Sequence, residues 1–470
     1  MSTRPSRRLA RRPARRLAVG CTALATLSAV VTAPAIANAA PAAPATPAGH
    51  HTGTLADGAT WIADVPDAWN GTLLLFSHGF GPTVAQDAPD SATQSALLAA
   101  GYALAGSSYD PHGSWWALGS AERDQFQTLD AFKAGVGQPA RTISIGESMG
   151  GLVNAQLVRD ADGRIAGSLG MCGLVAGGLD LNDYQLAGEV VLATLLAPDA
   201  AVHLTGYASS ADAAAVAQTL TDAVVAAQQT PAGRARIALA AAFLNLPAWA
   251  PGQNPPAPGD AAGQEQQQEA WIASGLLAFI IGSRPAIEQA AGGDSGSTVG
   301  LDWHALLASS VHRDEIRDLY HAAGLDLNAD LATLHAAPAY HADPAATAWL
   351  ARTSTAGQGL DAPLLDLHTT ADNLVPVEQE SAFADRVRAA GDARLLRQAY
   401  VARQGHCAFT PNEVLAGLHA VVHRIDTGRW GDTSAAALNA DQPAGTTAFL
   451  DFRPGRLVDA RPPCRAVPGD

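Results

Sequence analysis

The 470-residue sequence lacks several motifs that define common classes of protein. It has no phosphate-binding loop, no dinucleotide fingerprint and no Cys-x-x-Cys pair. His419 and His423 have the spacing of a helical zinc site, but no Glu completes the H-E-x-x-H arrangement of a metalloprotease. We therefore expect neither a cofactor nor a metal ion.

Lysine is almost absent, because Lys133 is the only lysine among 29 basic residues. Acidic residues number 44, so the formal net charge is −15. A net charge of this sign disfavours nucleic acids and anionic membranes as partners. The shares of hydrophobic residues (48%) and charged residues (16%) are those of a soluble globular protein and exclude a mostly disordered chain.

The first 39 residues have the three parts of a secretory signal. Basic residues and no acid precede position 17, an uncharged apolar run follows over 17–31, and small residues stand at the possible cleavage sites in 35–39. The apolar run is shorter than the roughly 20 residues that span a membrane. We expect export by the Sec or twin-arginine route, an extracellular location and no stable membrane anchor after cleavage.

The remaining chain divides by its strand and helix patterns. Short apolar runs that suit buried strands alternate with helical patterns in two separate stretches, which predicts an α/β fold: a mostly parallel sheet with helices on both faces. Ala-rich helical segments with little strand pattern lie between them. The predicted parts are a Pro/Ala linker (40–53), the α/β core (54–181 and 358–426), a helical insertion (182–357) and a C-terminal extension (427–470).

The segment 146–150 (GESMG) follows a predicted strand, 141–145, and precedes a predicted helix, 149–159. A G-x-S-x-G pattern between a strand and a helix is typical of a nucleophile elbow, in which the serine sits on a tight, strained bend. Larger side chains in place of the two glycines would collide with neighbouring backbone. We interpret Ser148 as a nucleophile, which needs a base to activate it.

The base and the acid are expected late in the chain. His406 follows the last predicted strand, and Asp372 directly follows the predicted strand 363–368. Both emerge at carboxyl ends of strands, where open α/β sheets place their sites. Asp361 and Asp366 are alternative acids, but Asp366 lies within a strand and should point into packing, so we prefer Asp372.

This arrangement resembles the α/β-hydrolase superfamily over residues 54–181 and 362–425. The resemblance implies that Ser148 is the nucleophile, His406 the general base and then acid, and Asp372 the group that orients His406. It implies a secreted serine hydrolase of carboxylic esters, acting on a small or polymeric ester. A peptidase or amidase and a catalytically silent binding protein are the alternatives. The insertion stands where this superfamily commonly carries a cap.

Two backbone N–H groups are expected to form an oxyanion hole. One is that of Met149, directly after the nucleophile. The other is that of Phe80, in the loop His78-Gly79-Phe80-Gly81, which resembles the superfamily's His-Gly-X loop; we expect His78 to be structural. Three aromatic residues after the next strand are expected to line the substrate pocket: Tyr109, Trp115 and Trp116.

Three cysteines remain after the predicted cleavage: Cys172, Cys407 and Cys464. Export permits a disulfide, and the odd number leaves one thiol over. Cys172 lies at the end of a predicted core strand, whereas the tail that carries Cys464 is loop-like and free to fold back. We expect Cys407 to pair with Cys464.

Overall fold

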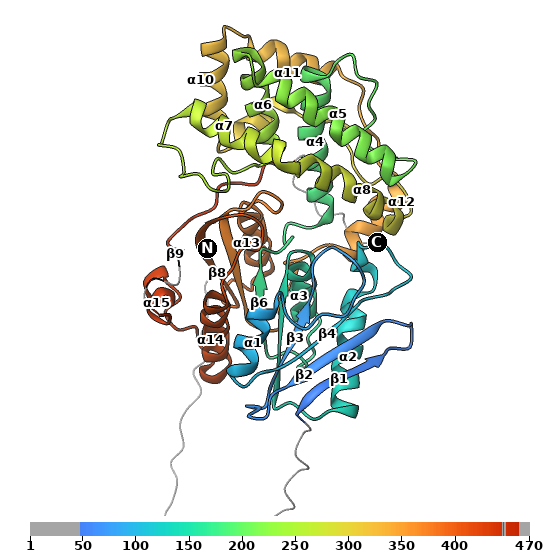
Figure 1. Ribbon diagram of the computed structural model, residues 1–470, viewed down its shortest axis with the longest axis vertical. Coiled ribbons are helices and arrows are strands. Elements are labelled where there is room, and N and C mark those ends of the chain that lie inside the picture. Colours follow the sequence, from blue (N-terminus) through green and yellow to red (C-terminus); the bar gives the residue numbers. More distant parts are fainter. Residues whose placement is uncertain (1–47, 444, 446–447, 460–470) are drawn as a thin grey trace, which may run out of the picture. The chain divides into compact units, whose positions relative to one another are not determined.

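The computed structural model describes residues 48–443, 445 and 448–459 (Figure 1). The predicted signal sequence, most of the predicted linker and Cys464 lie outside these residues. The described chain is built on a nine-stranded sheet of order β1-β2-β4-β3-β5-β6-β7-β8-β9. Its strands are β1 (Gly49–Thr54), β2 (Thr60–Val65), β3 (Thr72–Ser77), β4 (Ala103–Ser107), β5 (Arg141–Glu147), β6 (Gly167–Met171), β7 (Leu364–Ala371), β8 (Leu396–Gln404) and β9 (Phe449–Leu450).

The central strands β3 to β8 pair in parallel, whereas β1, β2 and β9 pair antiparallel at the two edges. Every residue of β3 is buried, as expected for a strand covered on both faces. Leu73 and Leu75 join the hydrophobic core on one face, and Leu74 and Phe76 join the core on the other. This alternation explains why the sequence shows a continuous apolar run here.

Helices cover both faces of the sheet, as the α/β pattern predicts (Figure 1). One face packs against α2 (Ala121–Gly135), α3 (Met149–Arg159) and α13 (Gln379–Ala390). The other packs against α1 (Ser91–Ala99) and α14 (Pro411–Thr427), with the short α15 (Ala435–Ala440) beside β9. Because β3 to β8 run parallel, their carboxyl ends lie at one edge of the sheet.

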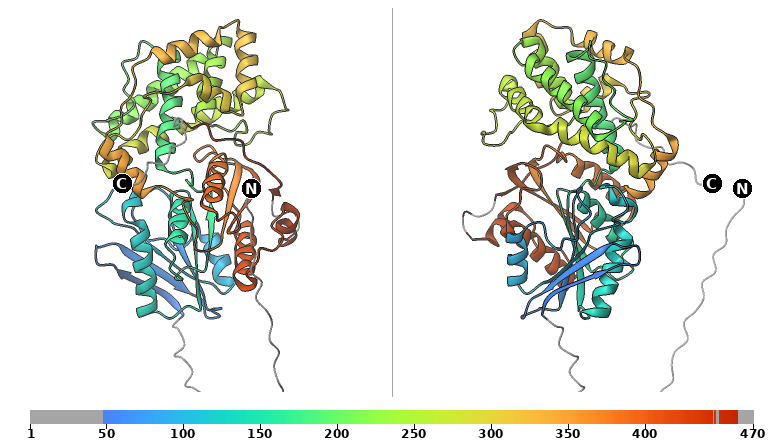
Figure 2. Two further views of the ribbon diagram at one scale, coloured as in Figure 1. Left: turned by 180° about the vertical axis from the view of Figure 1, so that it is seen from behind. Right: turned by 45° about the vertical axis from the view of Figure 1, so that its right-hand side comes forward.

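An all-helical insertion separates β6 from β7 and has a hydrophobic core of its own. In Figure 2 it lies beyond the carboxyl ends of the parallel strands. Its elements are α4 (Gly178–Leu196), α5 (Ser210–Ala227), α6 (Pro231–Phe243), α7 (Ala261–Trp271), the π-helical turn η2 (Ile272–Leu276), α8 (Leu277–Ala291), α9 (Trp303–Ser309), α10 (Arg313–Ala323), α11 (Leu327–Ala336) and α12 (Pro344–Thr353).

Two boundaries differ from those that the sequence predicts. The stretch 49–53, assigned to the linker, belongs to β1, because it pairs residue by residue with β2 across the turn at Asp57-Gly58. The insertion begins at Gly178 rather than at 182. Helix α4 is buried on nearly all sides, so its sequence has no polar face that would mark its start.

One helical segment of the described chain, Ala261–Ala291, is long and apolar enough to cross a membrane by length and composition. It comprises α7, η2 and α8, and Gly275 interrupts it with a φ of 104°. Of its most apolar window, 44% is buried within the protein, and core helices of soluble proteins meet the same criterion. The segment is therefore weak evidence for a membrane span.

Candidate active site

Ser148 lies on the bend between β5 and α3, with a φ of 56° in the left-handed region. A Cβ atom at Gly146 would lie 2.6 Å from the carbonyl oxygen of Gly150, and one at Gly150 would lie 1.9 Å from that of Ser77. The close approach of backbone therefore requires glycine at both positions. The backbone N–H of Ser148 donates to the carbonyl oxygen of Met171 at 2.9 Å, which connects the bend to the end of β6.

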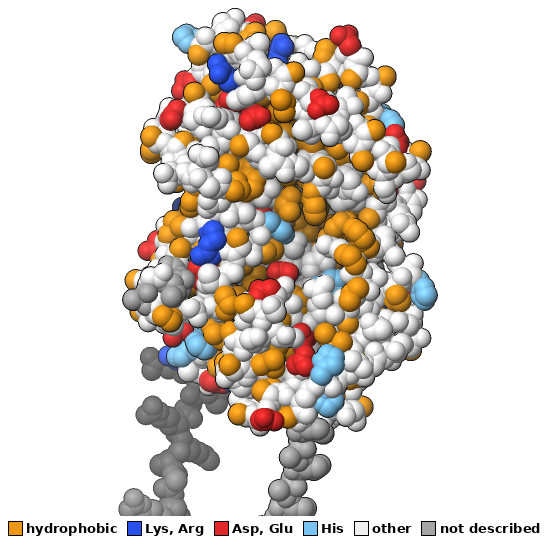
Figure 3. Space-filling model, viewed as in Figure 1, with side chains coloured by type: hydrophobic (Ala, Val, Ile, Leu, Met, Phe, Trp, Pro, Cys, Tyr) orange, Lys and Arg blue, Asp and Glu red, His pale blue; other side chains and the backbone are white. Residues whose placement is uncertain are grey.

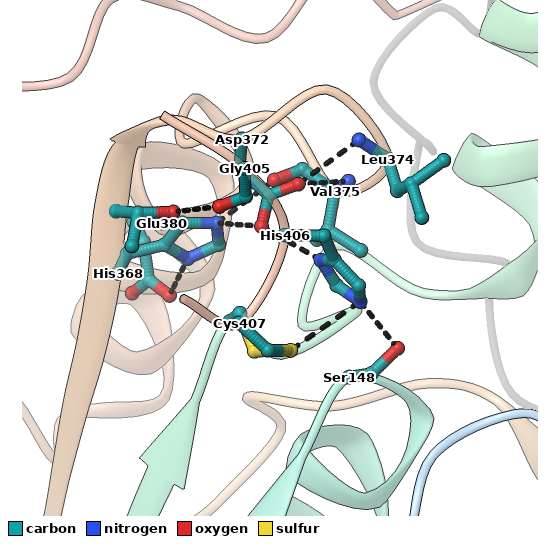
Figure 4. Close-up of a disulfide and its surroundings, with 11 residues drawn as sticks. Ser148, His368, Asp372, Leu374, Val375, Glu380, Gly405, His406 and Cys407 are labelled. Carbon is teal, nitrogen blue, oxygen red and sulfur yellow. Dashed lines mark hydrogen bonds and ion pairs between the residues drawn. A yellow bond between two sulfur atoms is a disulfide. The ribbon is translucent and has the colours of Figure 1, made fainter. Parts of the chain in front are cut away.

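The structure brings Ser148, His406 and Asp372 into one hydrogen-bonded chain (Figure 4). His406 Nε2 lies 2.8 Å from Ser148 Oγ, and His406 Nδ1 lies 2.7 Å from Asp372 Oδ2. The other carboxylate oxygen, Asp372 Oδ1, accepts the backbone N–H groups of Leu374 and Val375, both at 2.9 Å. All these groups lie at the carboxyl edge of the sheet.

The environment of Asp372 favours its charged form. Burial opposes the charge most strongly, but the positive charge and hydrogen bond of His406, the charge of His368 and the N–H of Val375 together lower the pKa of Asp372. An ionised carboxylate only accepts hydrogen bonds, so His406 Nδ1 carries the proton. When His406 is neutral, its Nε2 is then free to accept the proton of Ser148.

The two alternative acids lie elsewhere. Asp361 is exposed and precedes β7, so it stands at the opposite end of that strand from the site. Asp366 is buried within β7, where burial and the negative charge of Glu380 raise its pKa well above the usual range for aspartate. Neither carboxyl group contacts His406.

The loop after β3 passes beside Ser148. A Cβ atom at Gly79 would lie 3.2 Å from the Cβ atom of Ser148. Among the described residues, no acceptor takes the N–H of Phe80 or of Met149. These are the two donors that the sequence predicts for an oxyanion hole, and both remain available for a ligand.

Aromatic rings surround Phe80 and border a groove of about 490 Å³. The Phe80 ring lies 5.9 Å from Trp115, 6.4 Å from Trp116 and 6.1 Å from Phe279, which α8 of the insertion contributes. Trp115 and Phe279 are about half exposed and line the groove together with Phe80. Hydrophobic side chains gather along the junction of insertion and sheet in Figure 3.

Two residues predicted to line the pocket lie elsewhere. Tyr109 is completely buried: its ring stacks on His78 at 4.1 Å and its hydroxyl donates to the His78 carbonyl at 3.0 Å. Tyr109 therefore packs against the loop that carries Phe80, on the side that faces the core. Trp116 is 3% exposed and packs in the core behind Phe80. His78 is buried, and its Nδ1 lies 2.8 Å from the Gly79 carbonyl oxygen.

The predicted pairing of Cys407 with Cys464 is wrong, because Cys407 forms a disulfide with Cys172. Only β7 separates β6 from β8, and both cysteines follow the carboxyl ends of those strands, which brings their Cα atoms within 5.4 Å. The burial of Cys172 does not prevent the bond. The Cys407 sulfur lies 3.4 Å from His406 Nε2, so the disulfide directly adjoins the site.

Two residues beside Asp372 escaped the sequence analysis. His368 lies on β7, and Glu380 reaches it from α13 with Oε1 3.0 Å from His368 Nδ1. His368 stands four residues before Asp372 in a strand that reads as buried, which is a weak signal for a polar role. Nothing in the sequence marks Glu380.

The strand order, with an antiparallel β2 and a parallel core, together with a serine elbow after β5, is the α/β-hydrolase fold. No protein-family model matches the chain. The chain is 29% identical over 424 residues to an o-phthalyl amidase of Xanthobacter agilis, which covers 84% of this chain and 91% of that protein.

Solved structures share low identity and low structural similarity with the chain. Feruloyl esterase B from Aspergillus oryzae has 14% identity and a TM-score of 0.37 over 81% of this chain and 80% of its own. An esterase from Rhodococcus sp. has 15% identity and a TM-score of 0.36 over 81% and 99%. An acylaminoacyl peptidase of Pyrococcus horikoshii has 11% identity and a TM-score of 0.34 over 77% of this chain. The chain spans 38% of that peptidase.

Proposed function

We propose that the chain is a serine hydrolase that cleaves carboxylic esters through an acyl-enzyme intermediate. The observation that carries this proposal is the continuous path of hydrogen bonds from Ser148 Oγ through His406 to the buried carboxylate of Asp372. A serine hydroxyl is a weak nucleophile, and an oriented imidazole within 2.8 Å supplies the base that it needs.

In the first half of the reaction, Ser148 Oγ attacks the carbonyl carbon of the ester while its proton passes to His406 Nε2. The carbonyl oxygen becomes an oxyanion, which the N–H groups of Met149 and Phe80 would stabilise. Asp372 stabilises the imidazolium that forms. His406 then returns the proton to the leaving alcohol as the carbon–oxygen bond of the ester breaks.

In the second half, water replaces the alcohol. His406 takes a proton from the water, whose oxygen attacks the acyl carbon. The bond to Ser148 Oγ then breaks, and His406 returns the proton to that oxygen. The carboxylic acid leaves and the enzyme is restored. Every proton therefore passes through the single nitrogen His406 Nε2, which must be neutral at the start of each half.

Amide hydrolysis is a second candidate, and the similarity to the o-phthalyl amidase favours it. The same groups can perform both reactions, because His406 can protonate a leaving amine as readily as a leaving alcohol. The groove beside Phe80 favours apolar or aromatic groups in either kind of substrate.

We further propose that the insertion acts as a cap over Ser148. Contacts between the two parts support this role: Phe279 of α8 touches Phe80, and Ser114 Oγ donates to the carbonyl oxygen of Ala286 at 2.7 Å. A cap that excludes water would strengthen the oxyanion donors. We also propose that the protein is exported, which the sequence of residues 1–39 and the Cys172–Cys407 disulfide support.

A fluorophosphonate probe and matched substrates test the proposal. The probe should form a phosphorus–oxygen bond to Ser148 with release of fluoride, whereas a catalytically silent protein takes none. Nitrophenyl esters and nitroanilides of the same acyl group, together with a phthalyl amide, then separate ester from amide hydrolysis. Absence of both labelling and turnover would contradict the proposal.

A further inference from the structure

Two imidazoles flank the carboxylate of Asp372. His406 Nδ1 lies 2.7 Å from Asp372 Oδ2, and His368 Nε2 lies 3.6 Å from the same oxygen (Figure 4). His368 is completely buried. The mechanism above uses only His406, so a second buried imidazole at the acid has no assigned role.

Glu380 holds His368 from the side away from Asp372. Its Oε1 lies 3.0 Å from His368 Nδ1, and its Oε2 accepts a hydrogen bond from Gln398 Nε2 at 2.5 Å. Gln398 Nε2 also lies 2.7 Å from the backbone oxygen of Glu380. Glu380 is completely buried as well, so the imidazole has little freedom to turn.

The hydrogen bonds of His368 determine where its protons lie. The carbonyl oxygen of Val375 can only accept, and it lies 2.8 Å from His368 Nε2, so Nε2 carries a proton. At Nδ1 the partner is a carboxylate oxygen of Glu380, and an ionised carboxylate can only accept, so Nδ1 also carries a proton and the imidazole is a cation. Its Nε2–H group faces Val375 and Asp372.

Other ionisable groups around His368 come from three neighbouring segments. Burial and the charge of Glu380 raise the pKa of Asp366 on β7 well above its usual range. Glu378 before α13 and Tyr400 on β8 also have a pKa raised by burial. Burial opposes a charge on His368, but the hydrogen bond and charge of Glu380, the charge of Asp372 and the Val375 carbonyl together raise its pKa.

The Val375 carbonyl links His368 to the geometry of the site. Residues 372–375 form a turn in which Asp372 Oδ1 accepts the N–H of Val375, while the carbonyl of Val375 accepts the N–H of His368. The turn is thus held at its acid end by its own backbone and at its other end by His368. Movement of this turn would carry Asp372 Oδ2 away from His406.

We propose that His368 is a positioning residue for the reaction, which holds the 372–375 turn in place and places positive charge beside Asp372. This inference rests on the proposed function. Because His368 and His406 both face Asp372 Oδ2, the positive charge of His368 opposes a second positive charge on His406. Loss of His368 is therefore expected to change the pH dependence of the reaction.

The test is the variant His368→Gln, whose side-chain amide keeps an N–H donor near Nε2 but cannot become a cation. We expect kcat to fall about tenfold with KM unchanged, because His368 orients a residue of the site and does not contact the substrate. The acidic limb of the kcat/KM profile should move upward by about half a pH unit, because His406 keeps its proton to a higher pH. The rate of fluorophosphonate labelling should show the same shift.

His203→Gln is the control. His203 is an exposed imidazole of the insertion, with Nε2 3.0 Å from Asp212 Oδ2. Its loss should leave the acidic limb unmoved. If His368→Gln does not fold, Glu380→Gln should move the limb in the same direction, because His368 loses the partner that stabilises its charge.

The outcomes separate the two proposals. If wild-type protein labels at Ser148 and the acidic limb of the kcat/KM profile stays in place in His368→Gln and in Glu380→Gln, His368 is only structural and this inference is overturned. A limb that moves to lower pH also overturns it. If wild-type protein neither labels nor turns over any ester or amide, the proposed function itself fails.

Discussion

At the scale of single residues, the site depends on strained and buried groups. Ser148 adopts a φ of 56°, and a non-glycine residue in such a conformation costs on the order of 1–3 kcal/mol. Asp372 is a buried acid whose charge is maintained by His406, His368 and backbone N–H groups. The strain at Ser148 therefore costs free energy of folding, whereas the lowered pKa of Asp372 means that its charge is favoured in the folded protein at neutral pH.

Asp372→Asn should lower kcat by about 10⁴ while the protein stays folded. The amide oxygen can still accept from Leu374 and Val375, which leaves the amide NH₂ facing His406 Nδ1. His406 would then carry its proton on Nε2 and could not accept the proton of Ser148. Turnover of a nitrophenyl ester measures the effect, with the exposed Asp361→Asn as control. A loss below tenfold would show that Asp372 is not the acid of the site.

Asp366→Asn should stabilise the protein at high pH. The pKa of Asp366 is raised in the folded state, so the folded protein holds a proton that the unfolded chain releases above about pH 4. Wild-type stability is therefore lost as the pH rises from that value towards the raised pKa. Asparagine resembles the protonated acid and does not titrate.

The difference in unfolding free energy between Asp366→Asn and wild type should increase by up to about 1.4 kcal/mol per pH unit over this window. Urea denaturation at pH 5, 6 and 7 measures it. A difference independent of pH would mean that Asp366 is ionised in the folded protein.

At the scale of helices and strands, the site joins elements that are far apart in the sequence. Ser148 follows β5, Asp372 follows β7 and His406 follows β8. The disulfide from Cys172 to Cys407 connects the end of β6 to the loop that carries His406, across 235 residues of chain. It therefore holds His406 near the strand whose end accepts the N–H of Ser148.

Removal of this disulfide should weaken both stability and activity. In the double variant Cys172→Ser/Cys407→Ser we expect a loss of about 2–4 kcal/mol in unfolding free energy. Because the loop that carries His406 is then no longer cross-linked to β6, kcat should fall by a larger factor than the factor by which KM changes. Peptide mapping without reductant tests the pairing directly: a peptide that joins Cys407 to Cys464 would contradict the structure.

Many of the strands and helices could be predicted from the sequence. Strands buried on both faces show as continuous apolar runs, and amphipathic helices show as apolar residues with helical spacing. The prediction for α3 coincides with the structure from Met149 to Arg159. The start of helix α4 was missed since its polar residues are buried along with its apolar ones and form no separate face, and β1 was missed since it is a polar edge strand. The disulfide and the contact of His368 with Glu380 depend on which strands become neighbours, and local patterns do not contain that information.

At the scale of the whole molecule, the insertion and loops of the sheet share the groove that Phe80 lines. Phe80 and Trp115 come from loops of the sheet, and Phe279 comes from α8. Substrate choice should therefore depend on residues of both parts, whereas the chemistry depends on the sheet alone. This division separates specificity from reactivity.

Phe279→Ala and Trp115→Ala should change the ratio of kcat/KM between a large aromatic ester and nitrophenyl acetate by more than about fivefold, since each removes apolar surface from the groove. The rate with the acetate should change little. Val299→Ala is the control, because Val299 is an exposed apolar residue of the insertion that does not line the groove. A ratio within about twofold of wild type in both variants would make the insertion remote from substrate.

The central claim is that Ser148 is the nucleophile of this molecule, and intact-mass measurement after fluorophosphonate treatment tests it most directly. The account predicts one adduct per wild-type chain, located on the peptide that contains Ser148. It predicts no adduct in Ser148→Ala, which should fold normally and lose several powers of ten in kcat. An adduct on another residue, or a Ser148→Ala protein that keeps more than a few per cent of wild-type activity, would contradict the account.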